Sequence, residues 1–535
     1  MKQFCILFIL LTAEISVSAP NELNIGIIQE WSSFNPITSQ LASNEALFPF
    51  FLRKMVLRGA NGSVIADVAA NVPVLKNKKA TWVIKKNAKW ADGQSILCAD
   101  WFLGWQAGLD PKISVEARNV YEKIIRMEWA EKTPQTCVVT YASADWSYDR
   151  DLPPLLPSHV EKTVFEKFKN EPEGYDRNTN YISAPTNKAL YNGPYYVSEF
   201  KLGSHIILTR NEHFYGPKPK IGKIIITHIS DTSALKANLM AKQINAISAV
   251  GFPPDTALLF DEEFKKTGAP YKVRFQNSGI FQGIYFNLEN EIFKDVRVRE
   301  ALSRSINKEQ IVKAFFNDNL QVAESILSPQ HPAYTAQASI YSKNKAIKLL
   351  DEAEWKMGSN GVREKNGKPL LLIFKTSAGL KVLESIQVHV CEQFKSIGAL
   401  CSIKNEPPRI LLGQSVPHGE FDLSMYGQPI PPDSTITSYF SSKEIPTAKN
   451  SWAGGNSIRI NSKELDQMLV DFDKENNKQK RNSIIKKIES YLAKNYMMIP
   501  LYHRREAVVI PQNLTGVTDS FEGTAFTVPE NWNFN

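Results

Sequence analysis

The apolar positions of the chain follow two different periods, and segments of each kind alternate along it. Residues 23–27 alternate apolar and polar side chains, and residues 281–288 form a run rich in β-forming residues, as is typical of strands. Residues 462–475 and 478–495 instead carry apolar side chains at helical spacing. This mixture predicts an α/β fold.

The segment 191–245 contains the clearest succession of elements. An Asn-Gly-Pro turn at 192–194 leads into a strand, the apolar run 206–208 pairs back on it, and a further strand covers 224–227. A Gly-Pro pair at 216–217 breaks the chain between the last two strands. Nothing in this segment has the pattern of a catalytic site, so we expect it to be scaffold.

Length and charge limit the classes of protein to which the chain can belong. A chain of 535 residues is too long for one hydrophobic core, so two or three domains are expected. The formal net charge of +8 is spread over the chain, because basic and acidic residues alternate almost everywhere. The densest basic run, 76–86, is interpreted as solvated surface, with weak attraction to anionic surfaces or ligands as the alternative. We therefore expect no nucleic-acid partner.

The N-terminus predicts export. Lys2 precedes an apolar run at 4–11, and small residues at 17–19 suit a signal peptidase, so residues 1–19 are predicted to be a cleaved signal peptide. Cys5 stands at the start of the apolar run and not at its end, which argues against a lipid anchor. No later stretch approaches eighteen apolar residues, so no membrane insertion is expected. The mature chain is predicted to be a free, monomeric periplasmic protein.

The segment 191–245 resembles the extracellular solute-binding proteins of family 5, which serve ABC importers of oligopeptides and dipeptides. The family pattern there runs N-G-[PA]-Y/F, then L-x-R-N-x-x-Y/F, then I-x-x-I, and this chain follows it throughout. Residues 31–36 are similar to the first-strand loop of the family, 80–101 to its W-x-F and D-G signature, and 293–302 to its F-x-D-x-R-V-R-x-A-L motif. In the last motif, Asp295 is placed to cap a helix.

The resemblance implies a two-lobed periplasmic binding protein, class II-like and of the Venus-flytrap type, with an extra domain inserted in the first lobe. Two crossings of the chain between the lobes, near 276–279 and near 496–500, would make a hinge. The expected ranges are 20–63, 183–277 and 498–535 for a discontinuous lobe I, 64–182 for the extra domain II, and 278–497 for lobe III.

The segment 421–434 is the expected ligand-binding strand and loop. In peptide-binding relatives, the strand in this position lies beside the bound peptide, and an aspartate near its end anchors the free amino group of the peptide. In this chain that position falls near Ile430, and Asp433 matches a second acidic position of the motif. Loss of a charge-assisted bond weakens binding by roughly ten- to a hundredfold. Either Asp433 reaches into the site, or the ligand is not a free-amine peptide.

Eight residues are predicted to line the cleft between the lobes. Glycine lets a backbone approach a ligand closely, and aromatic rings supply a face for packing. The alternative to a ligand-binding role for Asp433 is that its side chain caps the segment that follows it. The candidates are Trp31, Ser32 and Ser33 from the first lobe, and Tyr426, Gly427, Gln428, Asp433 and Trp452 from the other.

Motifs of enzymes are incomplete in this sequence. Gly361, Gly367 and Lys368 resemble a P-loop, but the spacing is one residue too long and Pro369 stands where Ser or Thr must hold magnesium. An S-x-x-K pattern at Ser305 recurs several times along the chain and carries little information. The histidines are scattered singly, as in most cores and surfaces. We expect no catalytic residue, no metal and no cofactor.

Four cysteines remain after the predicted signal peptide: Cys98, Cys137, Cys391 and Cys401. An oxidising compartment permits pairing, and the short connection between Cys391 and Cys401 could let their side chains meet. Burial as small apolar side chains is the alternative, and the choice stays open for both pairs.

The resemblance implies the solute-binding component of an ABC importer. Its two lobes would close around an oligopeptide or a peptide-like solute and present it to a membrane permease with ATPase subunits. The alternatives are a sensory or regulatory binding protein of the same fold, and a non-peptide ligand such as a sugar, an opine or a metal complex. An enzyme is the third hypothesis, and the incomplete motifs argue against it.

Overall fold

The computed structural model of the chain describes most of the residues that follow the predicted signal peptide. The segment 1–19 lies outside the described residues, and so does Asp433. Within the described part, no helix is both long and apolar enough to cross a membrane. The described residues are 21–39, 42–59, 63–115, 118–144, 146–150, 152–250, 252–329, 331–336, 341–430, 434–450, 452, 454–518 and 527–535.

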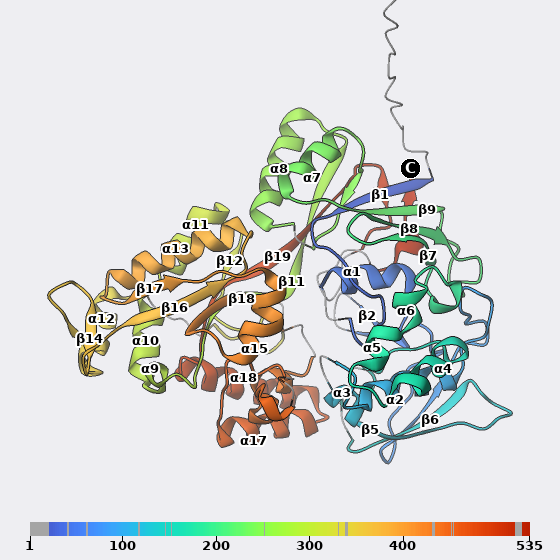
Figure 1. Cartoon of the computed structure of the whole chain (residues 1–535), viewed down its shortest axis with the longest axis horizontal. Coiled ribbons are helices and arrows are strands. Elements are labelled where there is room, and N and C mark those ends of the chain that lie inside the picture. Colours follow the sequence, from blue (N-terminus) through green and yellow to red (C-terminus); the bar gives the residue numbers. More distant parts are fainter. Residues whose placement is uncertain are drawn as a thin grey trace, which may run out of the picture.

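One eleven-stranded sheet runs through both lobes of the molecule (Figure 1). Its order is β17-β16-β18-β11-β19-β10-β1-β9-β8-β7, and β12 pairs with β19 beside this path. We call the part with β1 and β7 to β10 lobe I, and the part with β12 and β16 to β18 lobe III. The strands are β1 (Glu22–Ile27), β7 (Tyr195–Lys201), β8 (His205–Arg210), β9 (Lys223–His228), β10 (Ala246–Ile247), β11 (Tyr271–Phe286), β12 (Gln321–Val322), β16 (Leu371–Thr376), β17 (Leu400–Ile403), β18 (Leu423–Pro429) and β19 (Met498–Pro511).

Two long antiparallel strands, β11 and β19, belong to both lobes. Regular pairing between them is interrupted between Asn277 and Phe281, where the register shifts. This break lies at the first crossing predicted from the sequence, 276–279. The second crossing falls later than the predicted 496–500, because β19 still pairs with β12 of lobe III at His503. The passage between the lobes in β19 therefore begins at Arg504.

Lobe I buries a continuous apolar core under its strands. β1 pairs in parallel with both β9 and β10, while β7, β8 and β9 are antiparallel neighbours. These pairings confirm the strands predicted within 191–245. Helix α1 (Ala42–Phe51) adds Phe50 and Phe51 to the core beside Leu23 and Ile25 of β1.

The sheet of lobe III contributes to two separate cores. Along β11, Ile284 and Phe286 join one core, and Phe281 and Tyr285 join the other, as expected for side chains that alternate between the faces of a strand. The helices predicted at the C-terminal end are confirmed as α17 and α18. Helices α10 (Val296–Ser305), α11 (Lys308–Phe316) and α13 (Lys381–Lys395) pack in the first core, and α17 (Lys463–Lys474) and α18 (Lys478–Lys494) in the second.

A smaller sheet with its own core lies beside lobe I. Trp82, Trp90 and Trp101 are fully buried in it. The Trp101 indole donates a hydrogen bond to the Pro153 carbonyl at 3.0 Å, so this tryptophan is part of the core. The limits of domain II at 64–182 stay a prediction. The sheet has the order β4-β6-β5, and its elements are β4 (Lys79–Val83), β5 (Ile124–Glu128), β6 (Thr136–Tyr141) and helix α2 (Cys98–Leu109).

A buried ion cluster joins three distant segments of lobe I and its neighbour. Arg53, just after α1, forms an ion pair with Glu530 and lies 3.9 Å from Asp67. Tyr215 donates a hydrogen bond to Asp67 at 2.5 Å. Burial raises the pKa of Asp67, and the charge of Arg53 opposes that shift. The cluster links the C-terminal segment to the N-terminal part of the chain through Arg53 and Glu530. Removal of one partner would leave an uncompensated buried charge and would therefore destabilise the fold.

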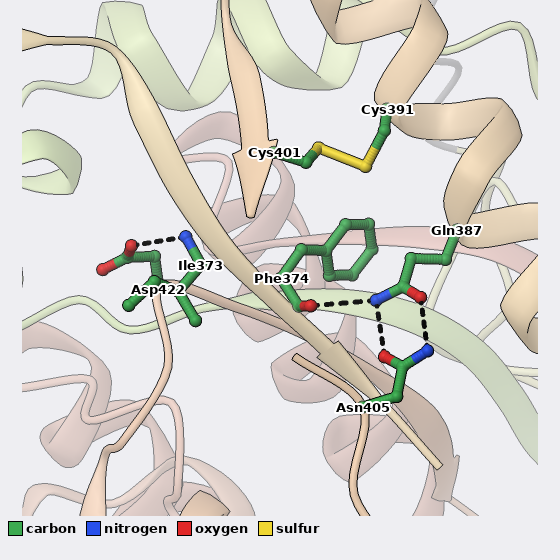
Figure 2. The surroundings of a disulfide bond; sticks show 7 residues. All are labelled: Ile373, Phe374, Gln387, Cys391, Cys401, Asn405 and Asp422. Atoms are coloured by element: carbon green, nitrogen blue, oxygen red, sulfur yellow. Dashed lines mark hydrogen bonds between the residues drawn. A yellow bond between two sulfur atoms is a disulfide. The ribbon is translucent and has the colours of Figure 1, made fainter. Parts of the chain in front are cut away.

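Both cysteine pairs that the sequence left open are disulfides, Cys98–Cys137 and Cys391–Cys401. The first joins α2 to β6 in the smaller sheet. The second joins α13 to β17 at the edge of lobe III (Figure 2).

Close to the second disulfide, hydrogen bonds fix the same helix to lobe III. The Gln387 amide of α13 donates to the Phe374 carbonyl of β16 at 2.9 Å. It also exchanges two hydrogen bonds of 2.9 Å with the Asn405 amide (Figure 2). Helix α13 is therefore attached to its sheet by a covalent bond and by a fully paired amide within one turn.

We expect loss of the first disulfide to cost more stability than loss of the second. The bridges span 39 and 10 residues, and restriction of the unfolded chain then contributes about 4 and about 3 kcal/mol, respectively. The variants Cys98→Ser/Cys137→Ser and Cys391→Ser/Cys401→Ser, compared with the oxidised parent by urea unfolding, measure this difference. Unchanged free energies of unfolding in both variants would contradict it.

A buried carboxylate makes the stability of lobe III depend on pH. Glu489 of α18 is 2% exposed and accepts a hydrogen bond from the Ser325 hydroxyl. Burial raises the pKa of Glu489 from 4.5 to about 7. The folded state thus holds this proton more tightly than the unfolded chain does. The resulting stability is fully present below the unfolded pKa of 4.5 and is lost as the pH rises through about 7.

The free energy of unfolding should therefore fall by about 3 kcal/mol as the pH rises across the interval between these two pKa values. Chemical denaturation at a series of pH values measures the slope of the free energy of unfolding against pH. Glu489→Gln should flatten it, whereas Glu464→Gln, which changes an exposed carboxylate of α17, should not. Equal slopes in the two variants would refute the assignment to Glu489.

Candidate functional site

The loop after β1 carries the three candidates of lobe I. The Asn44 amide of α1 donates to the Ser32 hydroxyl at 3.0 Å and to the Ser33 carbonyl at 2.8 Å, and it accepts from the Ser32 backbone amide at 3.2 Å. Trp31 is 2% exposed and packs edge-on against His228, with ring centroids 6.2 Å apart. The loop is thus rigid, with the half-buried serines at its surface and Trp31 largely in the core.

The end of β18 carries the adjacent candidates of lobe III. The Tyr426 ring is half-buried and stacks on Tyr285, with centroids 4.1 Å apart and planes 18° apart. Gly427 lies opposite Gln282 of β11, and Gln428 lies opposite Phe281. This pairing therefore holds β18 in a fixed register against the crossing strand β11.

Two side chains approach the backbone closely at Gly427. A Cβ atom there would lie 2.9 Å from Nη1 of Arg504 and 3.0 Å from Cγ2 of Ile280. Both distances are shorter than ordinary van der Waals contacts. The absent side chain leaves room for the Arg504 guanidinium beside the main chain of β18.

The position expected for an amine-anchoring carboxylate is buried in lobe III. Ile430 is 1% exposed, belongs to the core with α17 and α18, and donates its backbone N–H to the Gly279 carbonyl at 2.7 Å. The role predicted for Asp433 cannot be compared with a geometry, because this residue lies outside the described residues. The sequence expectation that this position lacks an amine-anchoring carboxylate therefore stays a prediction.

Trp452 lies against a histidine. Its ring is 37% exposed and packs on His418 with centroids 4.2 Å apart. Its backbone N–H donates to Thr447 at 2.8 Å. His418 ends helix α15 (Val416–His418), and Val416 of that helix shares a small cluster with Tyr426. Trp452 and Tyr426 therefore pack against the same short helix.

Arg504 is a candidate that the sequence interpretation missed. Its side chain is about one-third exposed, and Nη2 lies 2.9 Å from Oε1 of Glu506. Its carbonyl accepts a hydrogen bond from the Ser278 hydroxyl at 3.0 Å, which joins the two crossing strands. The signal was present as consecutive charged residues at 503–506, within a strand that is otherwise mostly apolar. The crossing itself thus contributes a charged group beside the candidate segment 426–428.

A second feature absent from the sequence interpretation joins the smaller sheet to lobe III. Trp146, in the loop after β6, is 6% exposed and belongs to a core cluster of lobe III. Its ring meets Phe472 of α17 edge-on at 5.7 Å and lies under the Arg481 guanidinium of α18 at 4.0 Å. The Asn476 amide donates to the Ala144 carbonyl at 3.1 Å beside it. We call this set of contacts the Trp146 contact.

Two enzyme-like features can be compared with the described residues. Within the described part of the chain, His, Cys, Asp and Glu side chains form no group of three or more that could hold a metal ion. The segment that resembles a P-loop is a hairpin turn: Asn366 and Gly367 have φ values of 52° and 72° between paired strands β14 (Arg363–Lys365) and β15 (Lys368–Pro369).

The two lobes share a pair of crossing strands, and each lobe carries aromatic and polar candidates. This arrangement is that of a two-lobed solute-binding protein. The sequence profile described as "Bacterial extracellular solute-binding proteins, family 5 Middle" matches residues 64–446. The chain belongs to this family, whose members are solute-binding proteins.

Known proteins resemble the chain along most of its length. The oligopeptide-binding protein AppA of Bacillus subtilis is 25% identical over 440 residues, which are 81% of this chain and 77% of that protein. The structure of AppA from Bacillus subtilis in complex with a nonapeptide matches with a TM-score of 0.83 at 23% identity, over 96% of this chain and 99% of the other. NikZ from Campylobacter jejuni in complex with Ni(L-His) matches with a TM-score of 0.81 at 24% identity, over 96% and 100% of the two chains. The same fold is thus found with a peptide in one structure and with a metal complex in another.

Removal of the Trp146 indole should favour separation of the smaller sheet from lobe III. Burial of an aromatic side chain of this kind contributes about 2–3 kcal/mol. In Trp146→Ala, small-angle X-ray scattering of the ligand-free protein should therefore report a larger radius of gyration than in the parent. Trp129→Ala is the matched control, because this half-buried tryptophan packs on Phe102 within the smaller sheet. Identical scattering from parent and Trp146→Ala would argue against the contact in solution.

Proposed function

We propose that this chain is the solute-binding component of an ABC importer, and that it encloses an oligopeptide or a peptide-like solute between its lobes. The observation that carries the proposal is the passage of β11 and β19 between the two lobes, with a register break in β11 at the passage. Bending at such a break changes the distance between the candidates 31–33 and 426–428 while each lobe keeps its core.

The proposal also covers the cellular compartment of the chain and its membrane partners. The signal peptide 1–19 would direct export to the periplasm, where disulfides of the kind found here persist. A membrane permease and its ATPase subunits would receive the closed form. Titration of such a permease with purified protein, with and without solute, measures whether the closed form is the one that binds.

The nature of the solute follows from the end of β18. Ile430, which is buried, stands where we expect peptide-binding relatives to carry the carboxylate that anchors a peptide amino group. The main chain and the rings around Tyr426 would then hold the solute by hydrogen bonds and packing, with little contribution from a free amine. A peptide-like solute without a free amino terminus fits these surroundings best.

A non-peptide solute is the second candidate. The same absence of an amine anchor favours it, and the fold accommodates a metal–amino acid complex in NikZ. Mass spectrometry of the solute that co-purifies with the protein separates the candidates directly. A sensory role for the same fold predicts that no permease or ATPase genes lie beside the gene for this chain.

Acetylation of a peptide's amino terminus should change its affinity for the purified protein by less than about tenfold, because Ile430 stands where the family motif has an amine-anchoring carboxylate. Isothermal titration with matched pairs of free-amine and acetylated peptides measures the ratio. Asp433→Asn is the informative variant. If free-amine peptides bind a hundredfold more tightly, and this preference disappears in Asp433→Asn, then Asp433 is the anchor and the prediction is wrong.

A further inference from the structure

A series of buried hydrogen bonds leads away from the loop that carries the candidates of lobe I. Asn35, which follows Ser33 in this loop, is fully buried, and its amide nitrogen Nδ2 lies 3.1 Å from Oγ1 of Thr179, 144 residues away in the sequence. The Thr179 hydroxyl in turn lies 2.8 Å from Oε2 of Glu161. Thr179 and Glu161 are also fully buried. We call these two consecutive hydrogen bonds the Asn35–Glu161 relay.

Three helices hold the far end of the relay. Glu161 lies in helix α4 (Ser158–Phe168), and Thr179 stands between helix α5 (Gly174–Asn178) and helix α6 (Asn180–Ser183). Each of these helices contributes one aromatic side chain to the core of lobe I, namely Phe165, Tyr175 and Tyr181. The relay thus joins the candidate loop to helices that are fixed by the same core.

The direction of both hydrogen bonds is set by backbone N–H groups. The Ile37 N–H donates to Oδ1 of Asn35 at 2.9 Å, so Nδ2 faces Thr179. Oγ1 of Thr179 therefore accepts from Asn35, and it also accepts from the Tyr181 N–H at 3.4 Å. Because both acceptor positions of the hydroxyl are used, its proton is donated to Glu161. The relay is complete only if residue 161 is an acceptor.

Glu161 is the strongest acceptor in these surroundings. Besides the Thr179 hydroxyl, Oε2 accepts from the Tyr175 hydroxyl at 2.7 Å, and Oε1 accepts from the Asn180 N–H at 2.9 Å. Hydrogen bonds to an ionised carboxylate are stronger than those between neutral groups. The carboxylate therefore fixes the position of the Thr179 hydroxyl, and through it that of the Asn35 amide.

The near end of the relay fixes the turn beside the candidates. The Asn35 backbone N–H donates to the Ser33 hydroxyl at 3.2 Å, and the Asn35 carbonyl accepts from the Ser39 N–H at 3.1 Å. The Asn44 amide holds the same loop from α1. A displacement of Asn35 therefore changes the position of the Ser33 hydroxyl even when Asn44 stays in place.

We propose that Glu161 is a positioning residue for solute binding, which holds the loop 31–36 through Thr179 and Asn35 in the arrangement that meets the solute. The inference rests on the proposed function, because it takes this loop as part of the surface that the solute contacts. Glu161 is fully buried and acts only through its neighbours.

Reversal of the relay tests this role. Glu161→Gln places a donor where Thr179 needs an acceptor, and Asn35→Asp places a second acceptor where Thr179 has only one proton to give. In the double variant Asn35→Asp/Glu161→Gln, the relay runs in the opposite direction and every donor again has an acceptor.

We expect each single change to lower the affinity for acetyl-tetraalanine amide about tenfold, and the double variant to return to within about threefold of the parent. Isothermal titration of the full chain measures these affinities. Glu166→Gln removes an exposed carboxylate of the same helix, so it is the matched control and should leave the affinity unchanged.

Hydrogen exchange of the full chain without solute measures the position of the loop independently of binding. The backbone amides of 32–37 should exchange about tenfold faster in each single variant, and at the rate of the parent in the double variant. Thr179→Val should reproduce the faster exchange, and Thr179→Ser, which keeps the hydroxyl, should not. This second pair keeps the test decisive if Glu161→Gln fails to fold.

Two results overturn the inference. One is that the losses of the single variants add up in the double variant. The other is that the free energy of unfolding falls while affinity and exchange stay unchanged, as a merely structural role predicts. Absence of peptide binding by the parent contradicts the proposed peptide function instead, and the exchange rates then decide whether Glu161 positions the loop.

Discussion

The hydrogen-bonded pairing of β11 with β19 is the interaction on which the rest of the structure depends. The same two strands complete both cores, with Val508 and Ile510 in lobe I and Ile284 and Ile499 in lobe III. Neither lobe can lose them without exposing backbone groups and apolar side chains together. Regular pairing is interrupted between Asn277 and Phe281 and again between Gln282 and Gly283, and we expect bending there to disturb the fewest hydrogen bonds.

The same constraint explains where the charged groups of β19 lie. Most of this strand is covered by one core or the other, and its side chains there are apolar. Residues 503–506 occupy the interval between the two cores and are His, Arg, Arg and Glu. His503 and Glu506 are buried even there, and all four side chains stand where the two lobes meet. An unusual cluster of charge in a strand thus marks the junction of two cores.

Sequence patterns predicted the local parts of this structure well. Asp295 caps α10 as expected, accepting a hydrogen bond from the Arg297 amide at 2.9 Å, and the strands of 191–245 and both C-terminal helices form where their periods indicate. Each of these depends on residues close in the chain. The overall two-lobed fold came from the family resemblance, because long-range strand order leaves little trace in any one segment.

The candidate site was predicted less completely, because its contacts join residues that are far apart in the chain. The segment 426–428 stays a prediction, and its close neighbour Arg504 lies far along the chain. Trp146 gave no periodic signal, and its partners in α17 and α18 are more distant still. The burial of Ile430 likewise depends on those helices. Such contacts become visible only when the tertiary structure brings the segments together.

The position of the Trp146 contact has a consequence for how the molecule moves. In Figure 1, helices α17 and α18 lie at the lower end of the molecule, and the upper part of β11 and β19 lies well above them. A small rotation about the crossing strands displaces the far end most, and a gap of about 0.5–1 Å already removes a quarter to a half of the attraction between packed atoms. Most of the resistance of the Trp146 contact to separation is therefore expected within the first ångström or so of opening. Lobe movement in this protein should have a threshold, so that it exchanges between discrete states and does not widen by degrees.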